Sequence, residues 1–234
     1  MITFGIDTAG RTVGVALMRD GQLLYDCYLD AGLTHSETLM NLVDAAFQST
    51  GLSPADVQLW GVCSGPGSFT GLRIGIAAVK GLAFASGALC APVSTLEALA
   101  QGFVGEGTIV TALDARRGEV YWAAFDLSPE HTRLVEDSAG PLSELDDFIK
   151  NCKKPVFFVG DGASLCYNKY DSLPGVLHCP PAYQRGRAGA VCLTAEKMYQ
   201  QGLCVPAAQL GASYHRLSQA ERERQARLKG EVTK

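Results

Sequence analysis

Residues 65–73 read Gly-Pro-Gly-Ser-Phe-Thr-Gly-Leu-Arg, and this glycine-rich stretch decides the fold. The apolar run Leu59–Cys63 before it predicts a buried strand, and the run Leu72–Ala85 after it predicts a helix. A loop between a strand and a helix often binds phosphate, because amides at the helix N-terminus attract anions. Here Gly71 and Leu72 stand where a P-loop carries Lys and then Ser or Thr. The loop therefore lacks both the cation for phosphate and the hydroxyl for Mg²⁺.

The segments around this loop alternate between strand and helix patterns. Thr34 and Glu37 form a capping box at the start of a helical apolar periodicity, and Gly51 suits its C-terminus. Three strands, a helix, a strand and a helix in this order resemble one lobe of the actin-like (ribonuclease-H-like) ATPase superfamily. The other predicted strands are Ile2–Asp7, Val13–Met18, Leu23–Leu29 and Cys90–Val93, and the other helices are Thr34–Thr50 and Thr95–Phe103.

The pattern partly restarts after Gly105–Gly107, which is the expected domain boundary. We therefore predict an α/β protein of two actin-like lobes, with an N-terminal lobe at 1–104, a C-terminal lobe at 105–205 and a C-terminal segment at 206–234. That segment is expected to return to the body in extended form and to end, at Ser218–Leu228, as a polar helix or disordered end. In the second lobe we predict strands at Thr108–Asp114, Glu119–Leu127 and Val156–Val159, a helix at Leu142–Asn151 and a closing helix at Ala188–Gln201.

Composition indicates a soluble cytoplasmic protein. The 234 residues are 47% hydrophobic and carry a net charge of −4, which excludes a molecule that binds nucleic acid with its whole surface. None of the eight cysteines forms a C-x-x-C pair, so reduced thiols are expected rather than zinc or disulfides. Met1–Asp7 has no basic region typical of a signal peptide. No apolar stretch of membrane-spanning length is free of charge or glycine, so no membrane contact is expected.

Proteins of the actin-like superfamily hold ATP between their lobes with two Asp-containing hairpin loops and a glycine-rich adenosine loop. The first loop keeps an aspartate and a hydroxyl. The second has arginines where close approach of a phosphate favours glycine, and the third places a carboxylate toward the nucleotide. We expect weak or no ATP binding and no cofactor. The residues of these degenerate loops are Asp7 and Thr8, then Asp114, Arg116 and Arg117, then Gly160, Asp161 and Gly162.

The loop at 65–73 resembles the signature of the TsaB (YeaZ) family, the non-catalytic subunit of the bacterial tRNA threonylcarbamoyladenosine machinery. Its members here are Gly65, Pro66, Gly67, Ser68, Phe69, Thr70, Gly71 and Arg73. Further family-like stretches are 6–8, 35–37, 93–96, 114–116, 118–121 and 160–162.

The resemblance implies a pseudo-enzyme that binds and activates the catalytic subunit TsaD through helices of the N-terminal lobe. A small ATPase, TsaE, would complete the complex, and tRNA would be reached indirectly through it. The reaction moves a threonylcarbamoyl group from an adenylate onto the adenosine beside the anticodon. An independent ATP-dependent enzyme of the actin-like superfamily is the alternative.

Metal and nucleophilic chemistry find little support in the residues. The catalytic paralogue of the family carries two histidines four apart on a helix, so that both face one metal. His35 matches the first, but Leu39 occupies the second position. Ser64, Ser68 and Cys63 have no recognisable general base. We therefore expect no metal and no catalytic residue.

The helix predicted at Leu72–Ala85 is apolar nearly all round. Such a helix is either enclosed within its own domain or meets a partner. In the second case one face lies against its own lobe, through Ile74, Ala77, Ala78, Gly81, Leu82 and Ala85. The predicted partner interface, which would also form a homodimer without TsaD, comprises His35, Leu39, Gly71, Leu72, Gly75, Ile76, Val79 and Ala83.

Overall fold

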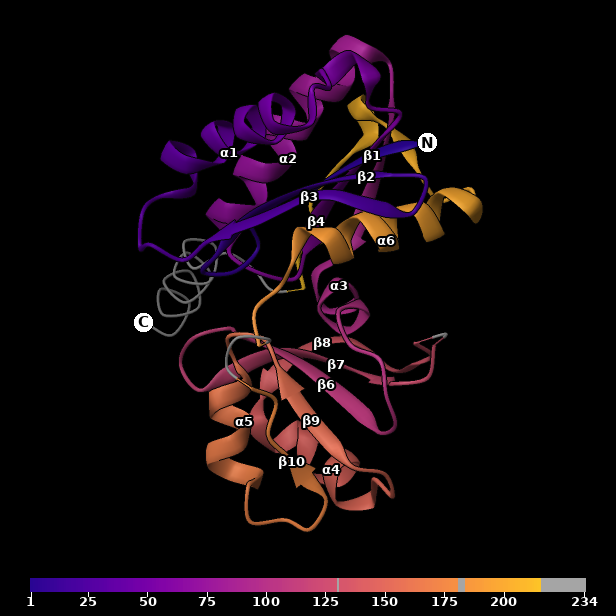
Figure 1. The fold of residues 1–234 in the computed structure, drawn as a ribbon. Helices are drawn as coiled ribbons and strands as arrows, with labels where there is room; N and C mark the ends of the chain where they lie inside the picture. Colours follow the sequence, from indigo (N-terminus) through magenta and orange to yellow (C-terminus); the bar gives the residue numbers. More distant parts are fainter. Residues whose placement is uncertain (130, 181–183, 216–234) are drawn as a thin grey trace, which may run out of the picture.

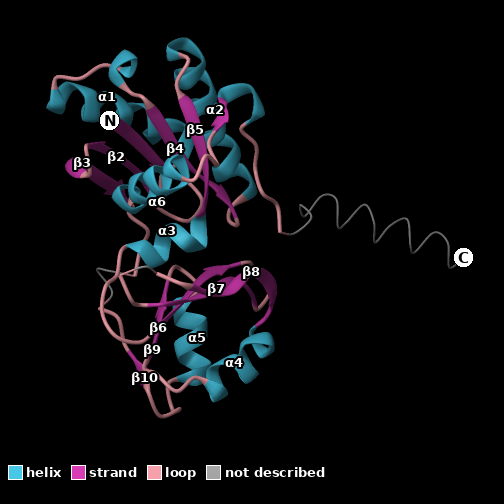
Figure 2. Ribbon diagram, turned by 90° about the vertical axis from the view of Figure 1, so that its right-hand side faces the viewer, coloured by secondary structure: helices cyan, strands magenta, loops and turns pink. Residues whose placement is uncertain are grey.

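Two β-sheets form the two lobes of the molecule in the computed structural model, which describes residues 1–129, 131–180 and 184–215 (Figure 1). The first sheet has six strands in the order β11-β5-β4-β1-β2-β3, and the second has five in the order β10-β9-β6-β7-β8. Helix α3 (Thr95–Gln101) lies at the junction, between the two sheets (Figure 2). The two-lobed actin-like α/β fold is thereby confirmed.

The first sheet is covered by helices on both faces. Helices α1 (His35–Thr50) and α2 (Phe69–Ser86) lie side by side on one face, and α6 (Ala188–Gln200) crosses the other (Figure 1). The core between α1, α2 and the sheet contains the buried rings of Phe4, Phe47 and Trp60. The strands are β1 (Ile2–Asp7), β2 (Val13–Arg19), β3 (Gln22–Leu29), β4 (Leu59–Gly65), β5 (Leu89–Ser94) and β11 (Val205–Pro206).

The second sheet carries helices on the face away from α3. Its strands are β6 (Thr108–Asp114), β7 (Glu119–Asp126), β8 (Arg133–Pro141), β9 (Val156–Val159) and β10 (Val176–Leu177). Its helices are α4 (Asp146–Asn151) and α5 (Ala163–Tyr170), and a short 3₁₀ turn at Leu142–Leu145 precedes α4. Two further 3₁₀ turns, at Pro54–Asp56 and Ala207–Gln209, belong to the first lobe. The two aromatic rings of Phe158 and Tyr167 meet edge to face in its core, with centroids 5.2 Å apart.

Most predicted strands and helices are confirmed, with three differences. Helix α2 begins at Phe69 rather than Leu72, because the Ser68 hydroxyl caps it by accepting a hydrogen bond from the Gly71 amide. Strands β8 and β10 and helix α5 were not predicted. The helix at 188–200 was assigned to the wrong lobe.

Helix α6 lies on the first sheet because its small residues fit closely against the strands there. A Cβ on Gly5 would lie 2.6 Å from the Ala188 carbonyl oxygen, and one on Gly61 would lie 2.9 Å from the Ala195 methyl. Strand β11 likewise pairs antiparallel with β5 of the first sheet. The predicted C-terminal lobe of 105–205 is therefore too long, since the chain has returned to the first lobe by α6.

The C-terminal segment packs on the first lobe as far as it is described. Leu210 is buried in the core with α1 and α2, and the Ser213 amide donates to the Ser64 carbonyl. The described part of this segment thus lies against the first lobe and contains a 3₁₀ turn at Ala207–Gln209. The polar helix or disordered end expected at Ser218–Leu228 lies outside the described residues.

Helix α2 is, within the described ranges, the single helix whose length and composition would suffice to cross a bilayer. Core helices meet the same criterion, and α2 buries six of its residues against the first sheet.

Candidate functional site between the lobes

The loops at the carboxyl ends of β1, β4, β6 and β9 enclose a cleft of about 750 Å³ between the lobes. This is the place where actin-like ATPases hold their nucleotide. The cleft contains all three predicted nucleotide loops and the signature loop. Three arginines and two aspartates line it among the described residues: Arg11, Arg116, Arg185, Asp114 and Asp161.

The first nucleotide loop is fully occupied by contacts within the chain. Asp7 is only 7% exposed, and its Oδ1 accepts a hydrogen bond of 3.0 Å from the Ala9 amide. Burial raises the pKa of Asp7, although the bond from Ala9 opposes this. The hydroxyl of Thr8, which is completely buried, donates to the Gly71 carbonyl at 2.8 Å. The Thr8 hydroxyl proton and one oxygen of Asp7 are thus engaged within the chain.

The glycines of the signature loop and of α2 allow this close contact. A Cβ would lie 2.5 Å from the Ala9 carbonyl oxygen at Gly67, 2.1 Å from the Thr8 carbonyl oxygen at Gly71 and 2.3 Å from the Thr8 hydroxyl at Gly75. Real Cβ contacts are longer, so these positions require glycine. The Ser68 amide also donates to the Ala9 carbonyl at 2.7 Å. The signature loop therefore packs onto the first nucleotide loop instead of leaving room for phosphates.

The second and third loops are joined by Asp161. Its Oδ1 accepts from the Asp114 amide at 2.9 Å, and burial raises the pKa of its carboxyl group. Gly160 and Gly162 approach the Ala112 carbonyl so closely that a Cβ would lie 2.1 and 3.1 Å from its oxygen. The expectation that Asp161 directs a carboxylate into the cleft agrees with its place in the cleft lining. The four loops thus hold one another in two pairs, the signature loop with the first nucleotide loop and the second with the third.

The outer end of the signature loop holds the C-terminal segment. The Tyr214 ring lies against Phe69 with centroids 4.9 Å apart, and the Arg73 guanidinium lies 3.8 Å from the centre of the Phe69 ring. Arg73 Nε also donates to the Tyr214 hydroxyl at 3.0 Å. A Cβ on Gly65 would lie 2.1 Å from the Ser213 carbonyl oxygen. Sequence reasoning noted residues 214–216 only as an extended segment and missed this contact.

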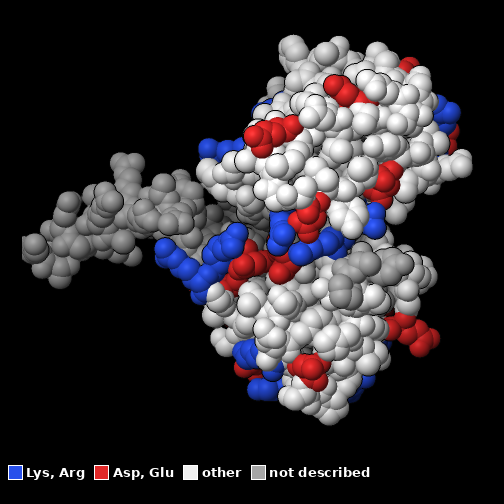
Figure 3. Space-filling view, turned by 60° about the vertical axis from the view of Figure 1, so that its left-hand side comes forward, with Lys and Arg blue, Asp and Glu red and all other residues white. Residues whose placement is uncertain are grey.

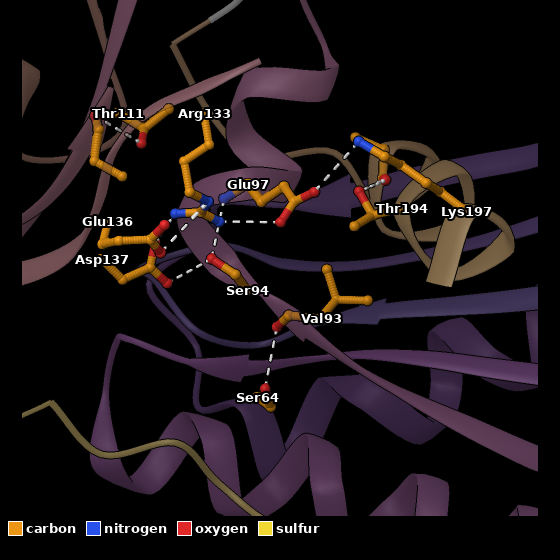
Figure 4. A network of polar contacts seen from close by, with 12 residues as sticks. Ser64, Val93, Ser94, Glu97, Thr111, Arg133, Glu136, Asp137, Thr194 and Lys197 are labelled. Carbon is orange, nitrogen blue, oxygen red and sulfur yellow. Dashed lines mark hydrogen bonds and ion pairs between the residues drawn. The ribbon is translucent and has the colours of Figure 1, made fainter. Parts of the chain in front are cut away.

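A polar network that includes Glu97 of α3 joins the two lobes (Figure 4). Arg133 on β8 donates to Asp137 at 2.5 Å and to Glu97 on α3 at 3.0 Å, and the Ser94 hydroxyl at the end of β5 donates to Asp137 at 2.6 Å. Lys197 on α6 lies 3.8 Å from Glu97. The hydrogen bonds and ion pairs to Asp137 and Glu97 raise the pKa of Arg133 against the opposing effect of burial. No sequence pattern predicts this network, because its members lie on four separate elements.

The predicted partner face of α2 is wrong. Leu72, Ile76, Val79 and Ala83 are at most 7% exposed and belong to the core of the first lobe, and Gly71 and Gly75 contact Thr8. The register is set by the Ser68 cap and by the glycines that face the first loop. The exposed residues of the helix include Arg73, Ala77, Gly81, Phe84 and Ala85. Three of these, Ala77, Gly81 and Ala85, were predicted to face the helix's own lobe.

The first turn of α1 holds a loop rather than a metal. Leu39 is 1% exposed and lies in the core, so it cannot serve as an interface residue. His35 Nε2 lies 3.0 Å from the Gly10 carbonyl oxygen and so fixes the first nucleotide loop. No cluster of three or more His, Cys, Asp or Glu side chains suited to a metal occurs among the described residues.

Comparison with known proteins agrees with this geometry. A family model described as "TsaD: tRNA N6-adenosine threonylcarbamoyltransferase" matches residues 30–169. The TsaB protein of Bacillus subtilis is 32% identical over 70% of this chain and 73% of its own length, and that of Escherichia coli is 38% identical over 53% and 55%. The alignments thus cover little more than half of the second relative.

Solved structures extend the likeness over nearly the whole chain. A protein of Pseudomonas aeruginosa described as similar to peptidase YEAZ has a TM-score of 0.79 at 26% identity, covering 92% of this chain and 99% of its own. The activator of 2-hydroxyisocaproyl-CoA dehydratase from Clostridium difficile, solved with bound ADPNP, has a TM-score of 0.50 at 12% identity, covering 86% and 97%. The second likeness shows the fold alone.

Fold and cleft together define a protein of actin-like fold whose first nucleotide loop is packed against the signature loop and whose second and third loops bind each other. Within that class, the chain belongs to the TsaB (YeaZ) family. Curated members of this family are named tRNA threonylcarbamoyladenosine biosynthesis proteins.

Proposed function

We propose that this chain is a non-catalytic subunit in the synthesis of threonylcarbamoyladenosine beside the tRNA anticodon, and that it binds and activates TsaD in the cytoplasm. The observation that carries the proposal is the contact of Thr8 with Gly71 and Gly75, which fills the first nucleotide loop. The names of the relatives support the pathway. TsaE would complete the assembly, and the tRNA would be bound within it.

The polar groups of the cleft support the absence of catalysis. Asp7 and Asp161 accept hydrogen bonds from backbone amides, and burial raises the pKa of each. Burial also raises the pKa of the Cys63 thiol well above its ordinary value, so the thiolate nucleophile is disfavoured. The carboxylates of Asp7 and Asp161 thus already have hydrogen-bond donors within the chain, and burial disfavours the Cys63 thiolate.

The partner surface is the outer face of α1 and α2. Phe84 is 79% exposed and Met40 on α1 is 44% exposed, although both side chains are apolar. Ala77, Gly81 and Ala85 on the same side of α2 are exposed and small, which lets a second helix approach closely. Burying these residues is favourable, so the same surface would form a homodimer when TsaD is absent.

Gly81→Leu tests this surface directly. A Cβ on Gly81 meets nothing within 4 Å, so the monomer can accept the side chain without strain. A partner helix packed there would be pushed away at a cost of about 1–3 kcal/mol, which corresponds to a roughly ten- to hundredfold loss of affinity. Gly105→Leu, at another glycine with open space but at the lobe boundary, is the matched control.

The measurements are analytical ultracentrifugation of both variants, alone and with TsaD, and a tRNA modification assay. We expect Gly81→Leu to weaken homodimer, TsaD binding and modification together, and Gly105→Leu to leave all three unchanged. Normal TsaD binding by folded Gly81→Leu would place the interface elsewhere. Unchanged modification in a reaction that lacks this chain would refute the proposed function itself.

A further inference from the structure

Basic side chains gather along the junction between the two lobes, although the chain as a whole carries a net charge of −4 (Figure 3). Arg11, Arg116 and Arg185 line the cleft there. Arg11 and Arg185 share one carboxylate, that of Asp30, at 2.7 and 3.8 Å. The three cleft arginines are matched in number by Asp30, Asp114 and Asp161, so the further positive charge at the cleft is that of Arg117 on the adjacent hairpin.

The hairpin between β6 and β7 presents two arginines in a conformation that arginine rarely adopts. Arg116 and Arg117 have φ values of +66° and +60°, in the left-handed region where glycine is favoured. Both are exposed, and the ion pair of the Arg116 guanidinium within the described residues is a loose one, 3.8 Å from Asp114. Residues at such angles are enriched at functional sites, and glycine would adopt them more easily.

An aromatic surface lines the same cleft as Arg116. Tyr214 is 46% exposed and lines the cleft, while Phe69 supports its ring from one side. Aromatic rings next to guanidinium groups are the combination with which proteins bind unpaired nucleotides, since bases stack and arginines contact phosphates. An acidic peptide would use the cations but not the ring.

The ligand that fits is a single-stranded RNA segment rather than Mg-nucleotide. The groups that would hold a polyphosphate and its metal, the Thr8 hydroxyl and the Asp7 carboxylate, are occupied within the chain. The arginines at the mouth remain, and a phosphodiester backbone passing over the cleft needs only such cations.

We propose that the cleft residues Arg116, Arg11, Arg185 and Tyr214, together with the exposed Arg117 next to Arg116 on the hairpin, bind the unpaired nucleotides of the tRNA anticodon loop. The choice of RNA rests on the proposed function, but direct contact by this chain goes beyond it. The hairpin arginines contact the backbone, and the open part of the Tyr214 ring stacks on a base.

The test replaces both hairpin arginines by glycine, in the double variant Arg116→Gly with Arg117→Gly. Glycine suits the positive φ angles, so the melting temperature should equal or exceed that of the wild type. Binding of a fluorescein-labelled anticodon stem-loop RNA is measured by anisotropy at several salt concentrations. We expect at least a fivefold loss of affinity and a slope of log K against log salt smaller by about 1.4, because each phosphate contact on a single strand contributes about 0.7.

Three controls define the outcome. Lys153→Ala removes an exposed cation before β9, at the end of the sheet opposite the cleft. It should change neither the RNA affinity nor the slope of log K against log salt. The double variant Arg116→Lys with Arg117→Lys keeps the charge and should retain most of the salt slope. A blunt duplex of the same stem should bind more weakly than the stem-loop and should be insensitive to Tyr214→Ala, whereas the stem-loop should lose affinity in that variant.

RNA binding is measured on the chain alone and with TsaD, so the two proposals can fail separately. Absence of a TsaD complex refutes the proposed function while the chain alone still tests the RNA site. Unchanged RNA affinity in the glycine variant, or equal loss in Lys153→Ala, overturns the RNA site. Loss of TsaD binding with RNA binding retained also overturns it and assigns the hairpin to a protein interface.

Discussion

The buried contact between Gly75 and Thr8 makes a quantitative prediction for Gly75→Ala. The new methyl would lie 2.3 Å from the Thr8 hydroxyl, which cannot move away without losing its hydrogen bond to the Gly71 carbonyl. Overpacking of this kind costs about 1–3 kcal/mol, and the better helix propensity of alanine offsets about 0.5–1 kcal/mol. We expect a net loss of about 1–2 kcal/mol, or a melting temperature lower by about 2–8 °C for a chain of this size.

Thr8→Ala turns this into a double-mutant cycle. Alone it removes one buried hydrogen bond and should cost about 0.5–1.5 kcal/mol. Combined with Gly75→Ala, it removes the atom with which the new methyl collides, so the double variant should be more stable than the sum of the single changes by about 1 kcal/mol. Urea unfolding of the four proteins supplies the free energies.

The control for helix propensity is Gly81→Ala, where a Cβ meets nothing within 4 Å. It should stabilise the protein by about 0.5–1 kcal/mol. If Gly75→Ala is as stable as the wild type, or if the cycle is additive within error, the glycines of α2 do not serve the approach of Thr8, and the account of the filled nucleotide loop is wrong.

Three further predictions concern the cleft and the lobe junction, and a fourth concerns metal. The isolated chain should bind Mg-ATP weakly or not at all, and calorimetry showing sub-micromolar affinity would contradict this. Burial raises the pKa of Asp7 above that of an unfolded aspartate. The stability that the protonated carboxyl contributes is therefore fully present below the unfolded pKa, and it is lost as the pH rises through the raised pKa of the folded state. Asp7→Asn should therefore raise stability at neutral pH and flatten the pH dependence of urea unfolding; a loss at neutral pH would show that the carboxylate is stabilising. Arg133→Met removes the cation that Asp137 and Glu97 share, although Glu97 keeps its 3.8 Å ion pair with Lys197, and should cost about 1.5–3 kcal/mol, with no change counting against the junction network. His35→Ala should remove no stoichiometric metal, and elemental analysis that finds one metal per wild-type chain but none in the variant would refute this.

The sequence predicted the strands and helices with strong apolar patterns and missed those without one. Strand β8 alternates between half-buried and exposed residues and carries Arg133, Glu136 and Asp137, so its sequence looks like a polar loop. It forms at the sheet edge because β7 pairs with it and because its charges bond across the lobe junction. Helix α6 was recognised as a helix, but its periodicity contains no information about which of two sheets it covers.

The site was predicted in its location more than in its contacts. The positions of Asp7, Asp114 and Asp161 follow from the order of strands, because loops at the carboxyl ends of central strands meet between the lobes. That Asp161 bonds the Asp114 amide could not be derived, since it depends on the approach of Gly162 to the Ala112 carbonyl within a fraction of an ångström. The prediction of which face of α2 points outward was wrong because small and apolar residues occur on all sides of this helix.

The two faces of α2 connect the filled cleft with the partner surface. Its inner face contacts Thr8 through Gly71 and Gly75, so a nucleotide in the first loop would require the helix to move outward. Its outer face, with Gly81 and Phe84, would move with it, because a helix of 18 residues shifts as a unit. A partner that fits the present position of α2 therefore binds the nucleotide-free state better than an opened one, and a ligand shifts such an equilibrium by its difference in affinity. The contact of Thr8 with Gly71 and Gly75 would thus hold in place the surface that the proposed partner recognises.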